Sequence, residues 1–222
     1  MPVISLKGRQ QNILVPDRII VIGAGAHANV VYATLRHTSI GRIEFADPAR
    51  VGAVVGDLPV VGDDDWVLAK KPAEVALVNA VGSTARPDVR AAVFEKFSSA
   101  GFTFATLVHP SAVVEKDVAL DEGVQIMAGV VVQAGVTIGA NTLVNTGATV
   151  DHDSTVSANC HIAPGVTICG GVRIGSTTHV GAGSTVIQSV EIGSRSVVGA
   201  GSLVTRNVPD NAAVGGCPAI PL

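Results

Sequence analysis

The sequence has 222 residues, enough for one large domain or two small ones. Hydrophobic residues make up 47% of it and aromatic residues only 3%, so Val, Ile and Ala must build the core. The net charge is −3 at pH 7 and no block of Lys and Arg is present, which argues against a surface for nucleic acid or for an anionic membrane.

The start of the chain and its cysteines bear on its location. The first 17 residues have no long apolar core and no small-residue cleavage site, so we expect a loose leader rather than a signal peptide. Cys160, Cys169 and Cys217 form no CxxC pair, and we expect reduced thiols in a cytoplasmic protein. The uncharged run between Glu122 and Asp151 is rich in Val, Thr and Gly, which are poor helix formers, so we expect no transmembrane helix.

Strand patterns alternate with helix patterns up to residue 108, which predicts a parallel α/β sheet. Residues 18–37 are typical of a strand, a Gly-rich turn and a helix. We expect further elements as follows: a strand over 42–47, a short helix over 63–71, a buried strand over 73–81, a helix over 86–101 and a strand over 102–108.

The Gly-rich turn fits the pattern G-x-G-x-x-A, from Gly23 and Gly25 through His27 to Ala28. Asp47 ends the second strand, and the combination is typical of nucleotide binding at a helix N-terminus. A dinucleotide domain needs two βαβ halves, and this part of the chain is too short for both. We therefore expect a mononucleotide or nucleotide sugar, with a turn that binds nothing as the alternative. His27 would suit an anionic or a sugar ligand.

A strict period of six residues follows. Every sixth residue from Leu120 to Val204 is aliphatic, and the register extends back to Val114 and Val108. A period of six indicates a hexapeptide β-helix, in which three hexads form one coil of 18 residues. The span from Val108 to Val204 predicts about five coils without a long loop. The tail at residues 207–222 then ends the pattern with Pro and Gly.

The coil length predicts which residues lie beside one another, because residues 18 apart stack on the same edge. His152 then lies beside Gly170, and His161 lies beside His179. His152 and His161 are half a coil apart, on different faces of the prism. They could meet only across a subunit boundary, so any joint function depends on oligomerisation.

His152 lies between two carboxylates, Asp151 and Asp153, in an otherwise small and aliphatic segment. A His beside a carboxylate suits general-base catalysis, because the imidazole can take a proton from an attacking group while the carboxylate orients it. We expect Cys160 in the core. The histidine spacings match no closed zinc site, so we expect no metal.

The GAGAHA turn and the uninterrupted prism, with NTGATVDHD and HIAPGVTICGGVRIG inside it, resemble the bacterial nucleotide-amino-sugar N-acyltransferases and the related sialic-acid O-acetyltransferases. The resemblance covers Arg18 to about Pro218. It implies an α/β Rossmann-like nucleotide-sugar-binding domain over 18–106. An all-β left-handed parallel β-helix, the acyltransferase domain with its C-terminal tail, would follow over 107–222. It also implies a homotrimer with acetyl-CoA, the co-substrate, between two prisms, and no permanently bound cofactor.

The resemblance further implies roles for single residues. His152 would be the general base, and Asp153 would orient it. The other implied positions are substrate contacts at Gly23, Gly25, His27, Asp47 and Asn145, and acetyl-CoA contacts at His161, Gly170 (through its backbone N–H), Ala182 and Ala200.

The implied activity is acetyl-CoA-dependent N-acetylation of the 4-amino group of a nucleotide-linked 4-amino-4,6-dideoxyhexose, GDP-perosamine or a UDP-linked sugar. The product would enter O-antigen, capsule or glycan synthesis. Asp47 is the single acidic residue directly after the second strand, and it leaves the identity of the nucleotide base open. A tail without a basic residue leaves the CoA phosphates to Arg195 or Arg206. The alternatives are O-acetylation of sialic acid or another sugar hydroxyl, a non-catalytic nucleotide sensor, and a small NAD-dependent enzyme.

Overall fold

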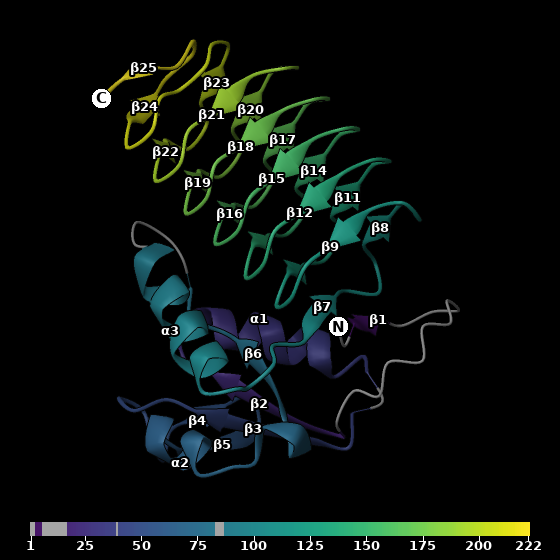
Figure 1. Ribbon diagram of the computed structural model, residues 1–222, viewed down its shortest axis with the longest axis vertical. Helices are drawn as coiled ribbons and strands as arrows, with labels where there is room; N and C mark the ends of the chain where they lie inside the picture. The colour runs from purple at the N-terminus through teal and green to yellow at the C-terminus, as the bar shows by residue number, and fades with distance from the viewer. Residues whose placement is uncertain (1–2, 6–16, 39, 83–86) are drawn as a thin grey trace.

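The computed structural model describes residues 3–5, 17–38, 40–82 and 87–222, and shows a small α/β part from which a long three-sided prism rises (Figure 1). Most of the 17-residue leader lies outside the described residues. Within it, β1 (Val3–Ser5) pairs in parallel with β7 (Thr106–Val108) of the prism. The expectation of a loose leader is wrong for these three residues, because the open edge of β7 offers them hydrogen-bond partners.

The sheet of the α/β part has the strand order β4-β5-β3-β2-β6, and its pairings are parallel except that of β4 with β5. Successive residues of β2 point to opposite faces: Ile19 and Val21 share a core with α1, whereas Ile20 and Ile22 share another with α2 and α3. The bounds are β2 Arg18–Ile22, α1 Ala26–Leu35, β3 Arg42–Ala46, β4 Val54–Val55, β5 Leu58–Gly62, α2 Asp64–Leu68, a 3-10 turn Pro72–Glu74, β6 Ala76–Asn79 and α3 Pro87–Ser99.

Two features of this part differ from the sequence analysis. The hairpin β4–β5 was missed, although its signal is a Gly56-Asp57 turn between apolar residues. Gly56 has a φ of 60°, which glycine adopts without strain. Residues 102–108, expected as one strand, divide between two sheets, because Phe104 bridges to Leu77 of β6 while β7 belongs to the prism.

Three sheets form the sides of the prism, and the chain visits them in turn; all their pairings are parallel except that of β24 with β25. We call them the nine-stranded face (β1-β7-β10-β13-β16-β19-β22-β24-β25), the six-stranded face (β23-β20-β17-β14-β11-β8) and the five-stranded face (β21-β18-β15-β12-β9). Partners across neighbouring coils differ by 18 residues, as in Leu143–His161 and His161–His179. The five-stranded face marks five complete coils, as expected.

The strands of the coils have two residues each after β7. Their bounds are β8 Val113–Val114, β9 Ala119–Leu120, β10 Gln125–Ile126, β11 Val131–Val132, β12 Thr137–Ile138, β13 Leu143–Val144, β14 Thr149–Val150, β15 Thr155–Val156, β16 His161–Ile162, β17 Thr167–Ile168, β18 Arg173–Ile174, β19 His179–Val180, β20 Thr185–Val186, β21 Glu191–Ile192, β22 Val197–Val198 and β23 Leu203–Val204. The tail leaves the six-residue pattern but still adds β24 (Ala213–Gly215), paired with β22, and β25 (Ile220–Pro221), antiparallel to β24.

The aliphatic residues of the repeat fill the inside of the prism. Every sixth residue from Ile126 to Val204 is at most 2% exposed. Val108, Val114 and Leu120 of the first coil are only half-buried, since no further coil covers them. Within the described ranges, every helix falls short of the length and apolar character that a membrane crossing requires.

From Gly123 to Gly201, the corners of the prism turn through left-handed residues. Every sixth residue from Gly123 to Gly201 has a positive φ, and most of these residues are glycine. The exceptions include Asn141, Asp153 and Asn159, of residue types that tolerate this conformation better than most. Inside the corners, buried side chains donate to the carbonyl 15 residues further along, namely those of Thr142, Ser154, Cys160, Thr178 and Ser184.

A buried polar network fastens the α/β part to the prism. Asn79, at the end of β6, donates through Nδ2 to the carbonyl of Arg90 (3.0 Å) and to Oδ1 of Asn141 (3.1 Å). Arg90 on α3 is 1% exposed and donates to the carbonyls of Asn79 (2.7 Å) and Asn141 (3.1 Å). Gln125 of β10 donates to the carbonyl of Asn79 (2.6 Å). The carboxyl edge of the sheet is thereby held against the nine-stranded face.

Candidate active site

His152 lies exposed at the corner between the six-stranded and five-stranded faces. Its Nδ1 is 2.9 Å from Oδ2 of Asp153, and its backbone N–H donates to Oδ1 of Asp151 (2.9 Å). The pKa of His152 is raised above its usual value, chiefly by the hydrogen bond with Asp153 and next by the charge of Asp151. Because a carboxylate only accepts, Nδ1 carries the hydrogen, and Nε2 is left to take a proton.

Asp153 stands at a left-handed corner position, with a φ of 58°. Its Oδ1 lies over Gly135, one coil below, where an added Cβ would approach that oxygen to 2.8 Å. The N–H of Gly135 is held in turn by Oδ2 of Asp117 (3.0 Å). The absence of a side chain at Gly135 therefore makes room for the carboxylate beside His152.

Gly170 lies against the ring of His152, as the 18-residue spacing predicts. An added Cβ on Gly170 would be 2.6 Å from Nε2 and 2.7 Å from Cε1. The backbone around it is fixed, because Ser154 Oγ donates to the Cys169 carbonyl (3.0 Å) and the Gly171 N–H donates to the His152 carbonyl (2.8 Å). No described residue accepts a hydrogen bond from the Gly170 N–H, so this donor is available to an oxyanion near Nε2.

His161 and Asn145 form a second group, on the nine-stranded face and its corner. His161 is 5% exposed, and its ring meets that of His179 edge-on with 4.9 Å between centroids. Nδ2 of Asn145 lies 3.3 Å from Nε2 of His161. Because an amide N–H can only donate, Nε2 is the acceptor in this contact. Asn145 thereby orients the imidazole of His161.

The Gly-rich turn leaves the N-terminus of α1 open. Gly23 has a φ of 99°, and an added Cβ would lie 3.2 Å from the backbone of Ala80, so this position requires glycine. Gly25 is the N-cap of α1, and nothing lies within 4 Å of where its Cβ would be. A helix N-terminus with this free approach suits an anionic group such as a diphosphate.

Asp47 braces the same turn. Its Oδ2 accepts from the N–H of Ala24 (2.8 Å), and its Oδ1 accepts from the N–H of Ala49 (2.9 Å). Asp47, expected as a substrate contact only, thus also has a structural role. The carboxylate of Asp47 holds the Gly-rich turn against the end of β3.

His27, in the first turn of α1, makes a contact that the sequence analysis missed. Its Nε2 is 2.9 Å from Oε1 of Gln125, 98 residues away in the chain. Burial lowers the pKa of His27 to about 4, so the ring is neutral at pH 7. A neutral ring does not attract an anion, and of the two expected ligand types the sugar fits. The only sequence signal for Gln125 is a lone amide in an apolar run.

The candidate residues form separate groups within one chain. His152, Asp153 and Gly170 share one corner, whereas His161 lies on another face, as expected. Ala182 and Ala200 are exposed and stack on the corner that carries Asn145, where the Gly201 N–H donates to the Ala182 carbonyl (2.8 Å). The expected substrate contacts other than Asn145 lie in the α/β part, at Gly23, Gly25, His27 and Asp47.

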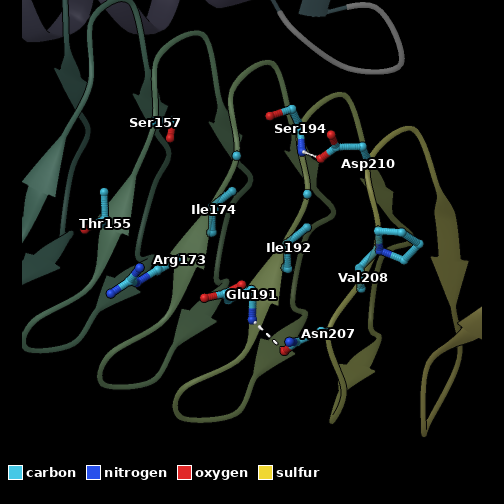
Figure 2. A pocket seen from close by; sticks show the side chains of 13 residues that line it. Thr155, Ser157, Arg173, Ile174, Glu191, Ile192, Ser194, Asn207, Val208 and Asp210 are labelled. Carbon is cyan, nitrogen blue, oxygen red and sulfur yellow. Dashed lines mark hydrogen bonds between the residues drawn. The ribbon is translucent and has the colours of Figure 1, made fainter.

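Hollows lie on two faces of the prism. One of about 230 Å³ is beside His152 on the six-stranded face, lined in part by Asp151, Thr167 and Cys169. A larger groove of about 700 Å³ runs along the five-stranded face (Figure 2). Its lining includes Arg173 and Glu191 but no His or Cys. The His152 corner is therefore the candidate for the chemistry, although the groove is the larger hollow.

The thiol of Cys160 lies in the core of the prism, away from the site. Cys160 is fully buried, as expected, and burial raises the pKa of its thiol to about 12. Among the residues that the structure describes, no group of three or more His, Cys, Asp or Glu is placed to hold a metal ion.

Comparison with protein families gives two matches. Residues 18–97 match the PglD N-terminal domain, and residues 171–206 match the bacterial transferase hexapeptide (six repeats). A comparison with the curated proteins gives no match.

Several solved structures are similar over most of the chain. A variant of perosamine N-acetyltransferase from Caulobacter crescentus, in complex with CoA and GDP-perosamine, is 38% identical with a TM-score of 0.86, covering 92% of this chain and 96% of that chain. The acetyltransferase domain of PglB from Neisseria gonorrhoeae FA1090, in complex with acetyl coenzyme A, is 35% identical with a TM-score of 0.86, covering 93% and 99%. WeeI from Acinetobacter baumannii AYE, 23% identical over 92% and 99% with a TM-score of 0.82, shares the fold.

Proposed function

This chain belongs to the hexapeptide-repeat N-acetyltransferases with a PglD-type N-terminal domain, the family of perosamine N-acetyltransferase, and on this premise we propose that it acetylates a nucleotide-linked 4-amino-4,6-dideoxyhexose at its 4-amino group. Acetyl-CoA is the acetyl donor. The observation that carries the proposal is the His152–Asp153 pair packed on Gly170. GDP-perosamine is the first candidate acceptor, because the relative at 38% identity was crystallised with it, and a UDP-linked amino sugar is the second.

His152 is the general base of the proposed reaction. The amine nitrogen attacks the thioester carbonyl carbon, and Nε2 of His152 takes one amine proton. Asp153 stabilises the imidazolium that forms, and the Gly170 N–H donates to the oxyanion. Collapse of the tetrahedral intermediate breaks the carbon–sulfur bond, and the leaving CoA thiolate takes the proton from Nε2. The products are the N-acetylated sugar nucleotide and CoA.

The nucleotide sugar lies between the Gly-rich turn and the nine-stranded face in this proposal. Its diphosphate meets the N-terminus of α1 beyond Gly25, with Asp47 on the side of the base. Gln125, which contacts His27, stands in the same row of the face as His161, two coils away. Two coils span about 10 Å. This length suits a sugar that extends from His27 toward the acetyl group.

A second subunit completes the site, since His152 faces away from His161 of its own chain. We propose a homotrimer in which the His152 corner of one prism meets the nine-stranded face of the next, with acetyl-CoA between them and in contact with Ala182 and Ala200. The register leads from Gly170 two coils further to Arg206, which we assign to the CoA phosphates. Both acetyl-CoA and nucleotide sugars are made in the cytoplasm, so we place the reaction there, with its product entering O-antigen or a related glycan.

A thiol-release assay tests the proposed function. The purified protein is incubated with acetyl-CoA and, in turn, GDP-perosamine, a UDP-4-amino sugar and free sialic acid. We expect turnover of one nucleotide-linked amino sugar, with the added acetyl group on nitrogen by NMR of the product. Turnover of sialic acid alone would replace N-acetylation by O-acetylation. If none of the three compounds causes release of CoA, the proposed acceptor class is wrong.

A further inference from the structure

We propose that Gln125 is a positioning residue that keeps the hydrogen of His27 on Nε2, so that His27 offers Nδ1 to the nucleotide sugar as a hydrogen-bond acceptor. The ligand group at His27 is then a hydroxyl or N–H donor, and not a phosphate oxygen. The identity of the ligand rests on the proposed function, whereas the tautomer of His27 does not.

The orientation of the Gln125 amide is fixed by the backbone. Gln125 is fully buried, and its Nε2 lies 2.6 Å from the carbonyl oxygen of Asn79. A carbonyl oxygen only accepts, so the amide nitrogen and not the amide oxygen must face it. The same carbonyl accepts from Nη1 of Arg90 (2.7 Å), which keeps it in place. Oε1 of Gln125 must therefore face His27.

The orientation of Gln125 determines the tautomer of His27. Oε1 of Gln125 is an acceptor, so Nε2 of His27, 2.9 Å away, must carry the hydrogen. Burial disfavours the imidazolium form of His27. The positive charge of the Arg90 guanidinium, the one charge of the described residues that acts on this ring, disfavours it further. A neutral ring with hydrogen on Nε2 has an unprotonated Nδ1, and no described residue is bonded to that atom.

The acceptor at Nδ1 separates the possible ligand groups. Phosphate oxygens are acceptors and would face Nδ1 unfavourably, whereas the N-terminus of α1 supplies them with N–H donors. A hydroxyl of the ribose or the hexose, or a ring N–H of the base, can donate to Nδ1. His27 therefore selects the nucleoside or sugar part of the ligand, and the helix N-terminus binds its phosphates.

Nitrogen NMR of the substrate-free protein tests the tautomer independently of the activity. The protein is labelled with ¹⁵N-histidine, and the His27 signals are assigned by their loss in the His27→Ala variant. We expect a protonated Nε2 and an unprotonated Nδ1, unchanged between about pH 5.5 and 8. The Gln125→Leu variant should lose this fixed pattern. A protonated Nδ1 or a charged ring in the unaltered protein would overturn the proposal.

Kinetics with the nucleotide sugar found in the thiol-release assay tests the role in binding. Gln125→Leu should raise its KM about fivefold to tenfold, the worth of one hydrogen bond, and leave the KM for acetyl-CoA unchanged. In a His27→Ala background the same change should have no further effect, because Gln125 acts through His27. An equal effect in both backgrounds would show a merely structural role and would contradict the proposal.

The chemical source of the donated hydrogen follows from binding of three probes to His27→Ala. Weaker binding of the nucleoside diphosphate places the donor on the ribose or base. Weaker binding of the nucleotide sugar alone places it on the hexose. Weaker binding of inorganic pyrophosphate would show that His27 meets a phosphate, and the proposal would be wrong.

Discussion

At the scale of the residue, His152 combines exposure with a fixed partner. Its side chain is 62% exposed, yet Asp153 holds its Nδ1 and Gly170 lies against its other nitrogen. In the proposed reaction, Asp153 favours the imidazolium of His152, which helps the transition state but raises the pH at which this base becomes neutral. The base is available above the raised pKa and is lost as the pH falls through it.

Replacing Asp153 by Asn should lower the pKa of His152, because its largest cause, the hydrogen bond to a carboxylate, is removed. The acid limb of kcat/KM should then move to lower pH. The plateau should fall by about 10²-fold or more, since the imidazolium loses its stabilising charge. A pH–rate profile measures both effects. Asp151→Asn, which removes only the second cause, should shift the limb less, and an unmoved limb in Asp153→Asn would mean that another group titrates.

Gly170→Ala should displace the imidazole of His152, because the new Cβ would lie 2.6 Å from Nε2. The φ of Gly170 is not in the left-handed region, so the backbone tolerates alanine. We expect kcat to fall about 10²-fold with unchanged thermal unfolding. In a His152→Ala background the substitution should cost nothing further. An additive loss in the double variant would point instead to the approach of the thioester.

At the scale of the element, the prism is stable through repetition. Its two-residue strands are too short to persist alone, and each coil satisfies the backbone groups of the next. The inward aliphatic side chains of neighbouring coils form one continuous core, which also includes residues of the α/β part. This core is less well covered at the first coil than at the last one.

Two valines on the six-stranded face provide a matched comparison. Val186 in β20 is fully buried, whereas Val114 in β8 is half-buried. Val186→Ala should lower the free energy of unfolding by about 2 kcal/mol, from lost burial and the cavity that remains. Val114→Ala should cost clearly less. Denaturant unfolding at one protein concentration measures both, and equal losses would show that the first coil is as well covered as the rest.

At the scale of the whole molecule, the fold divides the chemistry among separate surfaces. The Asn79–Arg90–Asn141 network fixes the Gly-rich turn on the nine-stranded face, near the row of Gln125 and His161. His152 lies at the edge of the six-stranded face that is farther from the nine-stranded face. In the proposed reaction, one chain thus presents two half-sites that cannot close on each other.

Mixed trimers test this division. His152→Ala subunits and His161→Ala subunits should each be nearly inactive alone. When they are unfolded together and refolded, activity should return at about one interface in four, where an intact His152 meets an intact His161. Mixing without refolding is the control and should restore nothing. Failure of the refolded mixture, with trimers present by light scattering, would show that each site uses one chain only.

The period of six residues predicts the prism, and it also predicts which residues lie beside His152 and His161, from the sequence by itself. An 18-residue coil leaves no choice of neighbour, so the contacts of His152 with Gly170 and of His161 with His179 follow from counting. The alternation of strands and helices likewise indicated the α/β sheet. The hairpin β4–β5 and the pairing of β1 were missed, because short edge strands have little pattern of their own.

The way the α/β part sits on the prism could not be predicted from the repeat and is known from the folded structure alone. The contact of His27 with Gln125 joins residues 98 apart, and no period connects them. The neutral state of the His27 imidazole depends on its burial at this junction. The contacts by which Asp47 holds the turn depend on the backbone N–H groups of Ala24 and Ala49. A repeat specifies contacts within itself, because each coil is the template for the next. A junction between unlike parts has no such template, so the side-chain packing and hydrogen bonds formed in the folded molecule determine it.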